Sequence, residues 1–457
     1  MSFFAKTGES RHSLYLNPAA IIPIEDEDED DGEDDGDGYV TAEEEFCDEV
    51  EDGGGRNCSH KFLQVQSFKA GSKSGSFVKE RRIPTLTEPF RLERKGSFQD
   101  GKKKGVAGIV STVMELLKGF RPGSDITKLQ LPPQFNLPKS QLQVYGEAVY
   151  CCGQDYLGMC AAGATPVERM LAVVRFHLST TRPAPFLKAP YNPVLGETHH
   201  VSVGELNVLC EQVSHNPPVT ALYATNEVKK MEMLWWHQPV PRFYGGYVEA
   251  SIIGQRRLKL LEHQETYEFT SPNLQIRFFP NAGTAWVGST TVKCKETGLE
   301  AVVNFKPKAL FGMRGSSNKV SGKVFEKSSG NVLYELNGCW DGVVTLKDKA
   351  TGITSTLYDA QDAIIDIHAP AVANLEALSP VESVNVWLDV TTNMLNGDWD
   401  IAREAKRKLE ETQRALKKER LSSGTVWSPK YFSAVKGGGW EWNCAGQSVP
   451  SAPLVVE

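Results

Sequence analysis

The strongest constraint on the fold is a run of short strand patterns between about residues 206 and 357. Segments rich in β-branched, aromatic and alternating apolar residues are separated there by turn residues at short intervals. This spacing is typical of a large antiparallel sheet or barrel. The expected strands are Val208–Val213, Val219–Thr225, Gly246–Ile253, Tyr267–Thr270, Leu274–Phe279, Ala285–Val292, Glu300–Phe305, Ser321–Phe325, Asn331–Leu336, Gly342–Leu346 and Gly352–Leu357.

Three segments have helical patterns. Val106 to Phe120 carries an apolar stripe at helical spacing, which suits a core helix, a movable cover or an interfacial helix. Residues 165 to 182 form an amphipathic pattern that begins with a capping box of Thr165 and Glu168. Asp400 to Lys418 is heavily charged. Helices beside many strands predict an α+β protein.

Size and composition exclude several classes of protein. The 457 residues, 40% of them hydrophobic, suffice for a large buried core. The chain contains no run of 18 uncharged residues, so we expect no transmembrane helix. The first 24 residues also lack the apolar run of a signal peptide. The nine cysteines include no C-x-x-C pair, so we expect reduced thiols, no metal site and a cytosolic protein.

Charge divides the chain into tails and a domain. Residues 25 to 52 contain 18 Asp and Glu, whereas residues 53 to 104 contain 13 Lys and Arg against four acids. Residues 1–104 therefore read as a flexible tail. It is either a solubilising segment or two interaction patches, of which the basic one could bind anionic lipid and be weakened by phosphorylation of Ser97. We expect a folded domain over 105–435 and a C-terminal tail over 436–457.

Three polar motifs are candidates for binding. Glu211 to Pro218 reads Glu-Gln-Val-Ser-His-Asn-Pro-Pro, where two prolines end a strand beside a histidine and an amide. Lys188 to Glu197 is a proline-rich loop that carries a cation and an amide. Lys406, Glu410 and Arg414 recur every four residues on one helix face. From the residues alone, the first motif is a strand terminus, the second a tight connection and the third a solvated ion-pair ladder. The alternative is that they form a site for a phosphate.

Together these motifs resemble the oxysterol-binding-protein-related family, in particular its short plant members. The family fingerprint reads Glu-Gln-Val-Ser-His-His-Pro-Pro, the loop Pro190 to Glu197 is similar to a second signature, and Arg169 to Val173 and Leu131 to Pro133 match further family text. The resemblance covers roughly residues 105 to 435. It implies an incomplete antiparallel β-barrel around an apolar tunnel, with flanking helices and an N-terminal lid over residues 105–135.

The resemblance also implies ligands. One sterol, or one phosphatidylinositol 4-phosphate, would occupy the tunnel, and no cofactor is needed. Two positions depart from the family pattern: Asn216 replaces the second histidine, and Ala189 precedes the proline where Lys is usual, with Lys188 one residue earlier. The implied headgroup residues are Lys188, Asn192, His215, Asn216, Lys406, Glu410 and Arg414. The implied lid residues, which would contact sterol, are Val113, Leu116, Leu117 and Leu129.

The expected function is lipid binding and transfer, without catalysis. The protein would extract a sterol and carry it between membranes, with phosphatidylinositol 4-phosphate as an exchange ligand. A non-transferring lipid sensor or a tether at membrane contact sites is the alternative. Phe46, Asp48 and Glu51 resemble a motif that recruits family members to receptors of the endoplasmic reticulum membrane. We therefore expect a cytosolic protein that touches membranes peripherally and binds no nucleic acid.

Overall fold

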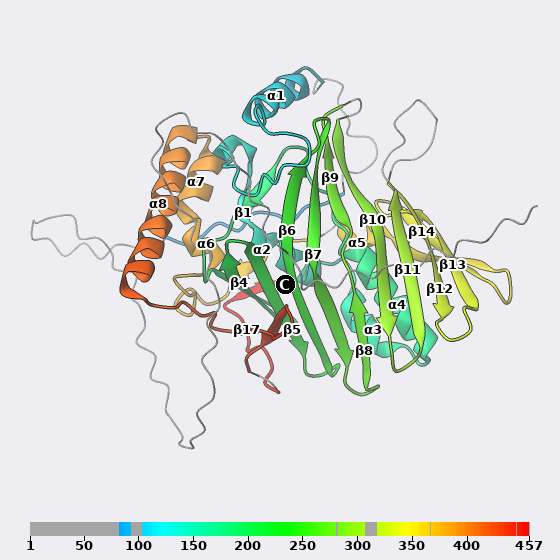
Figure 1. The fold of residues 1–457 in the computed structure, drawn as a ribbon. Helices are drawn as coiled ribbons and strands as arrows, with labels where there is room; N and C mark the ends of the chain where they lie inside the picture. Colours follow the sequence, from blue (N-terminus) through cyan, green and yellow to red (C-terminus); the bar gives the residue numbers. More distant parts are fainter. Residues whose placement is uncertain are drawn as a thin grey trace, which may run out of the picture. The chain divides into compact units, whose positions relative to one another are not determined.

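One large sheet organises the part of the chain that the structure describes (Figure 1). The computed structural model describes residues 82–92, 103–279, 282–306, 318–365, 367–444 and 446–456. The expected targeting residues Phe46, Asp48 and Glu51 lie outside these ranges, as does Ser97. No helix within the ranges is long and apolar enough to cross a bilayer.

Helices and strands follow one another as groups along the chain. The helices are α1 Lys103–Leu116, the 3-10 turn η2 Pro133–Phe135, α2 Gln141–Tyr150, α3 Tyr156–Ala162, α4 Pro166–Ser179, α5 Ala360–Ile364, α6 Ser383–Val386, α7 Leu388–Asn396 and α8 Trp399–Ser423. The strands are β1 Asn136–Ser140, β2 Ala189–Tyr191, β3 Thr198–Val203, β4 Leu206–His215, β5 Pro218–Asn226, β6 Met231–Phe243, β7 Tyr247–Leu260, β8 Glu265–Phe269, β9 Asn273–Arg277, β10 Gly283–Cys294, β11 Leu299–Lys306, β12 Lys319–Glu326, β13 Val332–Cys339, β14 Val343–Asp348, β15 Thr354–Asp359, β16 Ala371–Val372, β17 Phe432–Ala434, β18 Trp440–Trp442 and β19 Leu454–Val456.

The main sheet has 15 strands in an order that follows the sequence closely. From one edge to the other the order is β15, β14, β13, β12, β11, β10, β8, β7, β6, β5, β4, β3, β19 and β16. The remaining strand, β9, pairs with both β7 and β10. Strands β3 to β15 pair antiparallel, whereas β19 joins β3 in parallel. Most of the sheet is therefore a meander of local hairpins.

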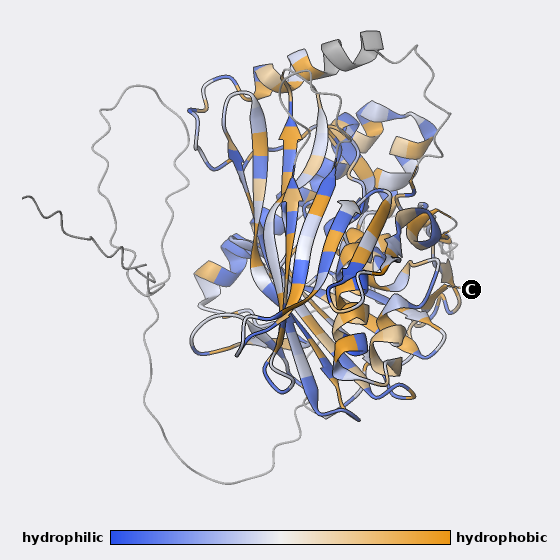
Figure 2. Ribbon diagram, turned by 90° about the vertical axis from the view of Figure 1, so that its right-hand side faces the viewer, coloured by the Kyte–Doolittle hydropathy of each residue, from blue (hydrophilic) through white to orange (hydrophobic). Residues whose placement is uncertain are grey.

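Alternation of side chains gives the sheet a buried face. In β11, Leu299, Ala301, Val303 and Phe305 are buried, and the residues between them are not. This period of two is what a strand with one covered face requires. Figure 2 shows it as alternating hydrophobic and hydrophilic bands along the strands.

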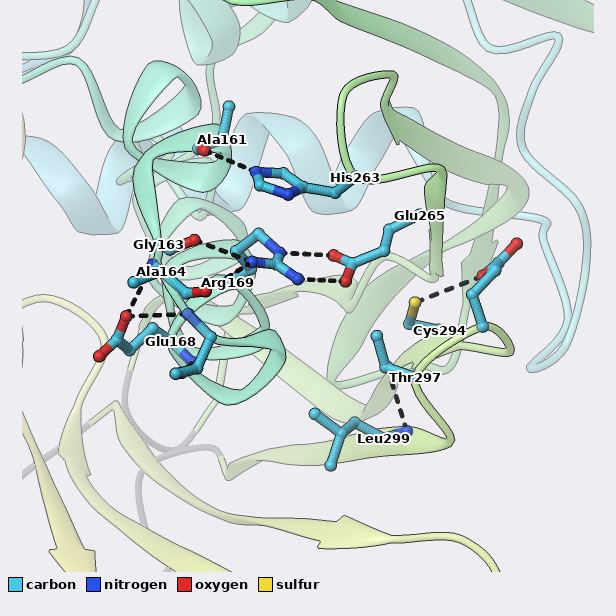
Figure 3. Close-up of polar contacts among 12 residues, drawn as sticks. Ala161, Gly163, Ala164, Glu168, Arg169, His263, Glu265, Cys294, Thr297 and Leu299 are labelled. Carbon is cyan, nitrogen blue, oxygen red and sulfur yellow. Dashed lines mark hydrogen bonds and ion pairs between the residues drawn. The ribbon is translucent and has the colours of Figure 1, made fainter.

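Helices α2, α3 and α4 pack on that face, which we call the inner face. They share one hydrophobic core with β4 to β15. Arg169 ties the start of α4 to β8, because its guanidinium donates to both carboxylate oxygens of Glu265 (Nε to Oε2, 2.7 Å; Figure 3). Tyr267 donates a further hydrogen bond to Glu265 (2.8 Å). Arg169, the first residue of the motif at 169–173, thus has a structural role.

The three expected helices are present. The apolar stripe from Val106 forms α1, although the helix ends at Leu116 rather than Phe120. Helix α4 begins with the expected capping box, in which Thr165 and Glu168 bond each other's backbone. The charged pattern forms α8, which extends to Ser423.

Strand β6 was missed by sequence reasoning because it contains Pro239 and Pro241. Beyond His237, β6 has no further pairing with β5 and its edge there meets residues 123–126 instead. The carbonyl of Pro241 faces that segment, so the missing N–H groups lie on that side. The ladder with β7 therefore continues unbroken to Phe243.

The region expected as a C-terminal tail, 436–457, contributes to the fold. Strand β18 pairs with β17, and β19 inserts between β3 and β16. Trp442 stacks on Tyr223, with ring centres 4.7 Å apart, on the face of the sheet opposite to the inner face.

Candidate functional site

Helix α1 lies over one rim of the sheet (Figures 1 and 2). Apolar side chains from its second half and from the residues after it pack against that rim. All four expected lid residues belong to one cluster: Val113 and Leu117 are buried, and Leu116 and Leu129 are partly buried. We call this group the lid cluster. Its members on the rim include Phe243 of β6, Val248 of β7 and Phe278 after β9.

A short backbone pairing fastens the segment after α1 to β6. The N–H groups of Gly123 and Ile126 donate to the carbonyls of Phe243 and Pro241, and Phe243 N–H donates to Ser124 (3.0 Å). These bonds satisfy backbone groups on the edge of β6 that β5 leaves free. The lid is therefore anchored at its C-terminal end, while α1 itself is held by side-chain contacts.

The proline-rich loop that follows β2 is rigidly supported from beneath. Tyr191 is buried and stacks on Trp387, with ring centres 4.3 Å apart. Glu197 accepts hydrogen bonds from the N–H of Val194 (3.0 Å), the indole of Trp387 (3.0 Å) and the hydroxyl of Ser383 (2.7 Å). Burial raises the pKa of Glu197, and these donors oppose the rise. The support leaves Asn192 exposed at the surface of the loop.

The histidine motif forms the turn between β4 and β5. His215 ends β4 opposite Pro218, and both His215 and Asn216 are exposed. Nδ1 of His215 donates to the carbonyl of Pro193 (3.1 Å), so the turn lies directly against the proline-rich loop. Glu211 has a structural role, since its carboxylate accepts from the backbone N–H groups of Lys430 (2.7 Å) and Tyr431 (2.9 Å).

Helix α8 approaches the same loop through an apolar face. Ala402, Ala405 and Leu409 pack in one cluster with Tyr191 and Val194. Lys406 and Glu410, which directly follow Ala405 and Leu409 in the sequence, form an ion pair of 2.6 Å. The Lys406 side chain is only 12% exposed. Arg414, one turn further on, is exposed, and in the described part of the chain Glu410 pairs with Lys406 rather than with Arg414.

The backbone before Lys188 is not extended, so its side chain does not follow the alternation of a regular strand. Leu187 has a left-handed backbone (φ +56°), and the ammonium of Lys188 donates to the carbonyl of Gln134 in η2. Helix α8 also contacts η2. Desolvation lowers the pKa of Lys188. The expected cation therefore bonds to η2, an element that α8 also contacts.

A hollow of about 120 Å³ lies between these elements on the inner face of the sheet. The proline-rich loop forms one wall, and the inner face of β4, β5 and β6 forms another. Its lining residues are Gln141, Ala189, Pro190, Tyr191, Asn192, Pro193, Gln212, Pro218, Thr220 and Pro239. Of the expected headgroup residues, Asn192 lines this hollow and His215 contacts the loop, whereas Lys188, Lys406 and Glu410 are not among its lining residues. Asn216 and Arg414 are exposed on the turn and on α8 respectively.

Sequence reasoning missed a second group of polar side chains on the inner face. Tyr145, His177, Trp235, His237 and Arg256 lie close together, and we call them the inner polar cluster. One sequence pattern could have identified it. Arg256 occupies the same face of β7 as the buried Leu258 and Leu260, and a cation in phase with buried apolar positions is unusual.

The fold and this arrangement define a ligand-binding α+β domain in which an open antiparallel barrel is covered by a lid helix. The family model "Oxysterol-binding protein" matches residues 115–392 and 388–450. Oxysterol-binding protein-related protein 4B of Arabidopsis thaliana is 44% identical over 381 residues, 82% of this chain and 98% of that protein. Human oxysterol-binding protein-related protein 10 is 30% identical over 392 residues, 76% of this chain and 50% of that protein.

Solved structures show the same fold. The Osh1 ORD domain in complex with cholesterol aligns with a TM-score of 0.63 at 21% identity, covering 80% of this chain and 91% of that one. The Osh3 ORD from Saccharomyces cerevisiae, in complex with PI(4)P, aligns with a TM-score of 0.56 at 22% identity, covering 80% and 96%. The chain belongs to the oxysterol-binding protein family, and the fold predicted from the sequence is confirmed. Members of this family bind and transfer lipids and are not enzymes.

Proposed function

We propose that this protein holds one sterol inside the barrel and carries it between membranes. This proposal rests on an apolar stretch of the inner face that lies between the lid cluster at one end and the inner polar cluster at the other. Its residues are half-buried, which distinguishes them from the packed core on either side. They are Pro239 and Pro241 of β6, Ala250, Ile252 and Gly254 of β7, and Leu274 of β9.

The length of this stretch suits a membrane lipid. Trp235 and Phe243 are eight residues apart on β6, a distance of about 26 Å at about 3.3 Å per residue. One leaflet of a bilayer is about 15 Å deep in hydrocarbon, so a molecule that spans a leaflet fits between the two clusters. Burial of each CH2 contributes about 0.8 kcal/mol, so an apolar wall with a closing lid supplies the affinity that extraction needs.

Exchange with a phosphoinositide is the second half of the proposal. The proline-rich loop and the turn at His215 border one hollow, and α8 packs beside the same loop. Cations with amide donors are suited to a phosphate headgroup. The PI(4)P complex of the similar Osh3 domain supports the idea. Asn216 can donate a hydrogen bond but cannot become cationic. We therefore expect Asn216→His to strengthen phosphoinositide extraction, and an unchanged affinity would show that this position does not meet the headgroup.

We also propose a cytosolic protein that touches membranes peripherally. Phe46, Asp48 and Glu51 would recruit it to the endoplasmic reticulum, where a receptor would bind the acidic tract. Deletion of residues 1–77, which retains the segment at 82–92 that bonds to Lys139 and Ile364, should then abolish co-localisation with that membrane while lipid binding persists.

A two-vesicle assay tests the central proposal. Purified protein is mixed with donor vesicles that contain a fluorescent sterol and with acceptor vesicles that lack it. Catalytic transfer, with many sterols moved per protein, supports the carrier. Stoichiometric extraction without transfer would instead favour a sensor or tether, and absence of extraction would refute lipid binding of this class.

A further inference from the structure

We propose that the inner polar cluster is an oxyanion site, which makes the protein select lipids whose leading end is a sulfate or carboxylate. This inference rests on the proposed lipid-binding function and adds the class of ligand. Its central group is the guanidinium of Arg256, which lies on the inner face of β7.

The cluster is assembled from two strands and two helices. Trp235 and Arg256 are directly opposite each other on β6 and β7, and the guanidinium carbon lies 3.7 Å from the centre of the Trp235 ring. His237 follows on the same face of β6, with its ring centre 5.3 Å from that of Trp235. Tyr145 of α2 covers His237, and His177 of α4 reaches Arg256 from the other side.

Arg256 is buried without a carboxylate, as is Arg182, whose guanidinium donates to the backbone carbonyls of Glu147 and Cys151. The other two buried Lys and Arg side chains of the described ranges each have a carboxylate partner. Arg169 is paired with Glu265, and Lys139 is paired with Glu147. Arg256 instead donates to the hydroxyl of Thr180 (2.7 Å) and contacts Nδ1 of His177 (3.5 Å), two neutral groups. Burial lowers the pKa of Arg256 to about 9, so the group remains a cation at neutral pH. The contact with Trp235 offsets only part of the desolvation of such a charge.

The cluster also has more donors than acceptors. In the ranges that the structure describes, Nε of Arg256, Nε1 of Trp235 and both ring nitrogens of His237 are buried without a hydrogen-bond partner. The arginine and tryptophan groups can only donate, and a neutral histidine supplies one further donor. A hydroxyl offers these N–H groups a single oxygen, whereas a sulfate or carboxylate offers several oxygens and a negative charge. The chemistry of the cluster therefore matches an oxyanion better than an alcohol.

The position of the cluster indicates how a ligand would reach it. His237 is directly opposite Thr220, which lines the hollow, and Tyr145 lies one helical turn after Gln141, another lining residue. The cluster thus adjoins both the hollow and the apolar stretch. A lipid would enter with its acidic end leading, and its apolar body would remain between Trp235 and the lid cluster.

The test compares two ligands that differ only at the polar end. Cholesterol and cholesterol sulfate are each presented to the full-length protein in phosphatidylcholine vesicles, and extraction is measured by vesicle flotation. We expect at least a tenfold preference for the sulfate ester. Arg256→Met should reduce this preference to less than twofold while cholesterol extraction stays within about threefold of wild type, and Arg256→Lys should retain much of it.

Arg257→Met is the matched control, because Arg257 is the next residue, lies on the opposite face and pairs with Glu441. It should leave the preference unchanged. Extraction of cholesterol with no preference in the wild-type protein would overturn the oxyanion site while sustaining the proposed function. Failure to extract either sterol would instead contradict the proposed function. Inorganic sulfate should raise the thermal midpoints of the wild type and of Arg256→Met equally, because it is excluded from the protein surface. A larger rise in the wild type would show a free-anion site and so overturn the lipid selection.

Discussion

Truncation of one buried lid side chain should accelerate lipid release. Leu117 is 2% exposed and packs in the lid cluster directly after α1. Leu117→Ala removes three carbons, or about 2.4 kcal/mol at about 0.8 kcal/mol per carbon. If the closed lid loses that contact energy before the ligand leaves, the dissociation rate should rise about 50-fold, at tenfold per 1.4 kcal/mol. The assay loads the protein with a fluorescent sterol and follows its release into excess acceptor vesicles by stopped flow.

Leu421→Ala provides the same chemical change at an exposed position, since Leu421 is 72% exposed at the end of α8. Its release rate should equal that of wild type. Release from Leu117→Ala at the wild-type rate would refute the argument that the lid cluster limits dissociation. An equal acceleration in both variants would show that the effect is not specific to the lid.

Three further predictions concern the core and the headgroup site. Glu265→Gln leaves the Arg169 guanidinium buried without its charge partner, and should reduce the free energy of unfolding by about 3–5 kcal/mol in urea titrations. Burial and the nearby cation lower the pKa of His177 from 6.5 to about 3. Because the unfolded chain takes up a proton that the folded His177 cannot, stability should be complete above pH 6.5 and fall as the pH drops towards 3, and His177→Gln should flatten this dependence. Lys406→Ala should weaken phosphoinositide extraction by roughly tenfold or more with sterol extraction unchanged, whereas Lys408→Ala, on the exposed face, should affect neither; equal loss of both ligands would point to a folding defect.

Local patterns predicted those parts of the fold that depend on near neighbours in sequence. The meander from β10 to β15 followed from alternating residues and turns, because each strand pairs with the next one along the chain. The capping box of Thr165 predicted the start of α4 within one residue. Strand β6 was missed, because Pro239 and Pro241 break the local pattern although their missing N–H groups face away from β7.

The candidate site was only partly predictable for a related reason. The motifs at 190–197, 211–218 and 406–414 identified the family and the polar residues. The structure brings the loop and the turn to one hollow and packs α8 beside the loop. The position of Lys188 depended on the left-handed backbone at Leu187, which no side-chain pattern indicates. Arg256 alternates in phase with Leu258 and Leu260, but only the structure shows which groups surround its side chain on that face.

The sequence by itself determined the antiparallel meander from β10 to β15 and the start of α4, since each depends on near neighbours along the chain. Its motifs also identified the family. Only the tertiary structure decided that β19 joins β3 across 250 residues, that α1 closes the rim, and that Arg256 lies inside without a carboxylate. Those outcomes depend on which distant surfaces are buried against one another. Burial is a property of the assembled fold, and local propensity does not encode it.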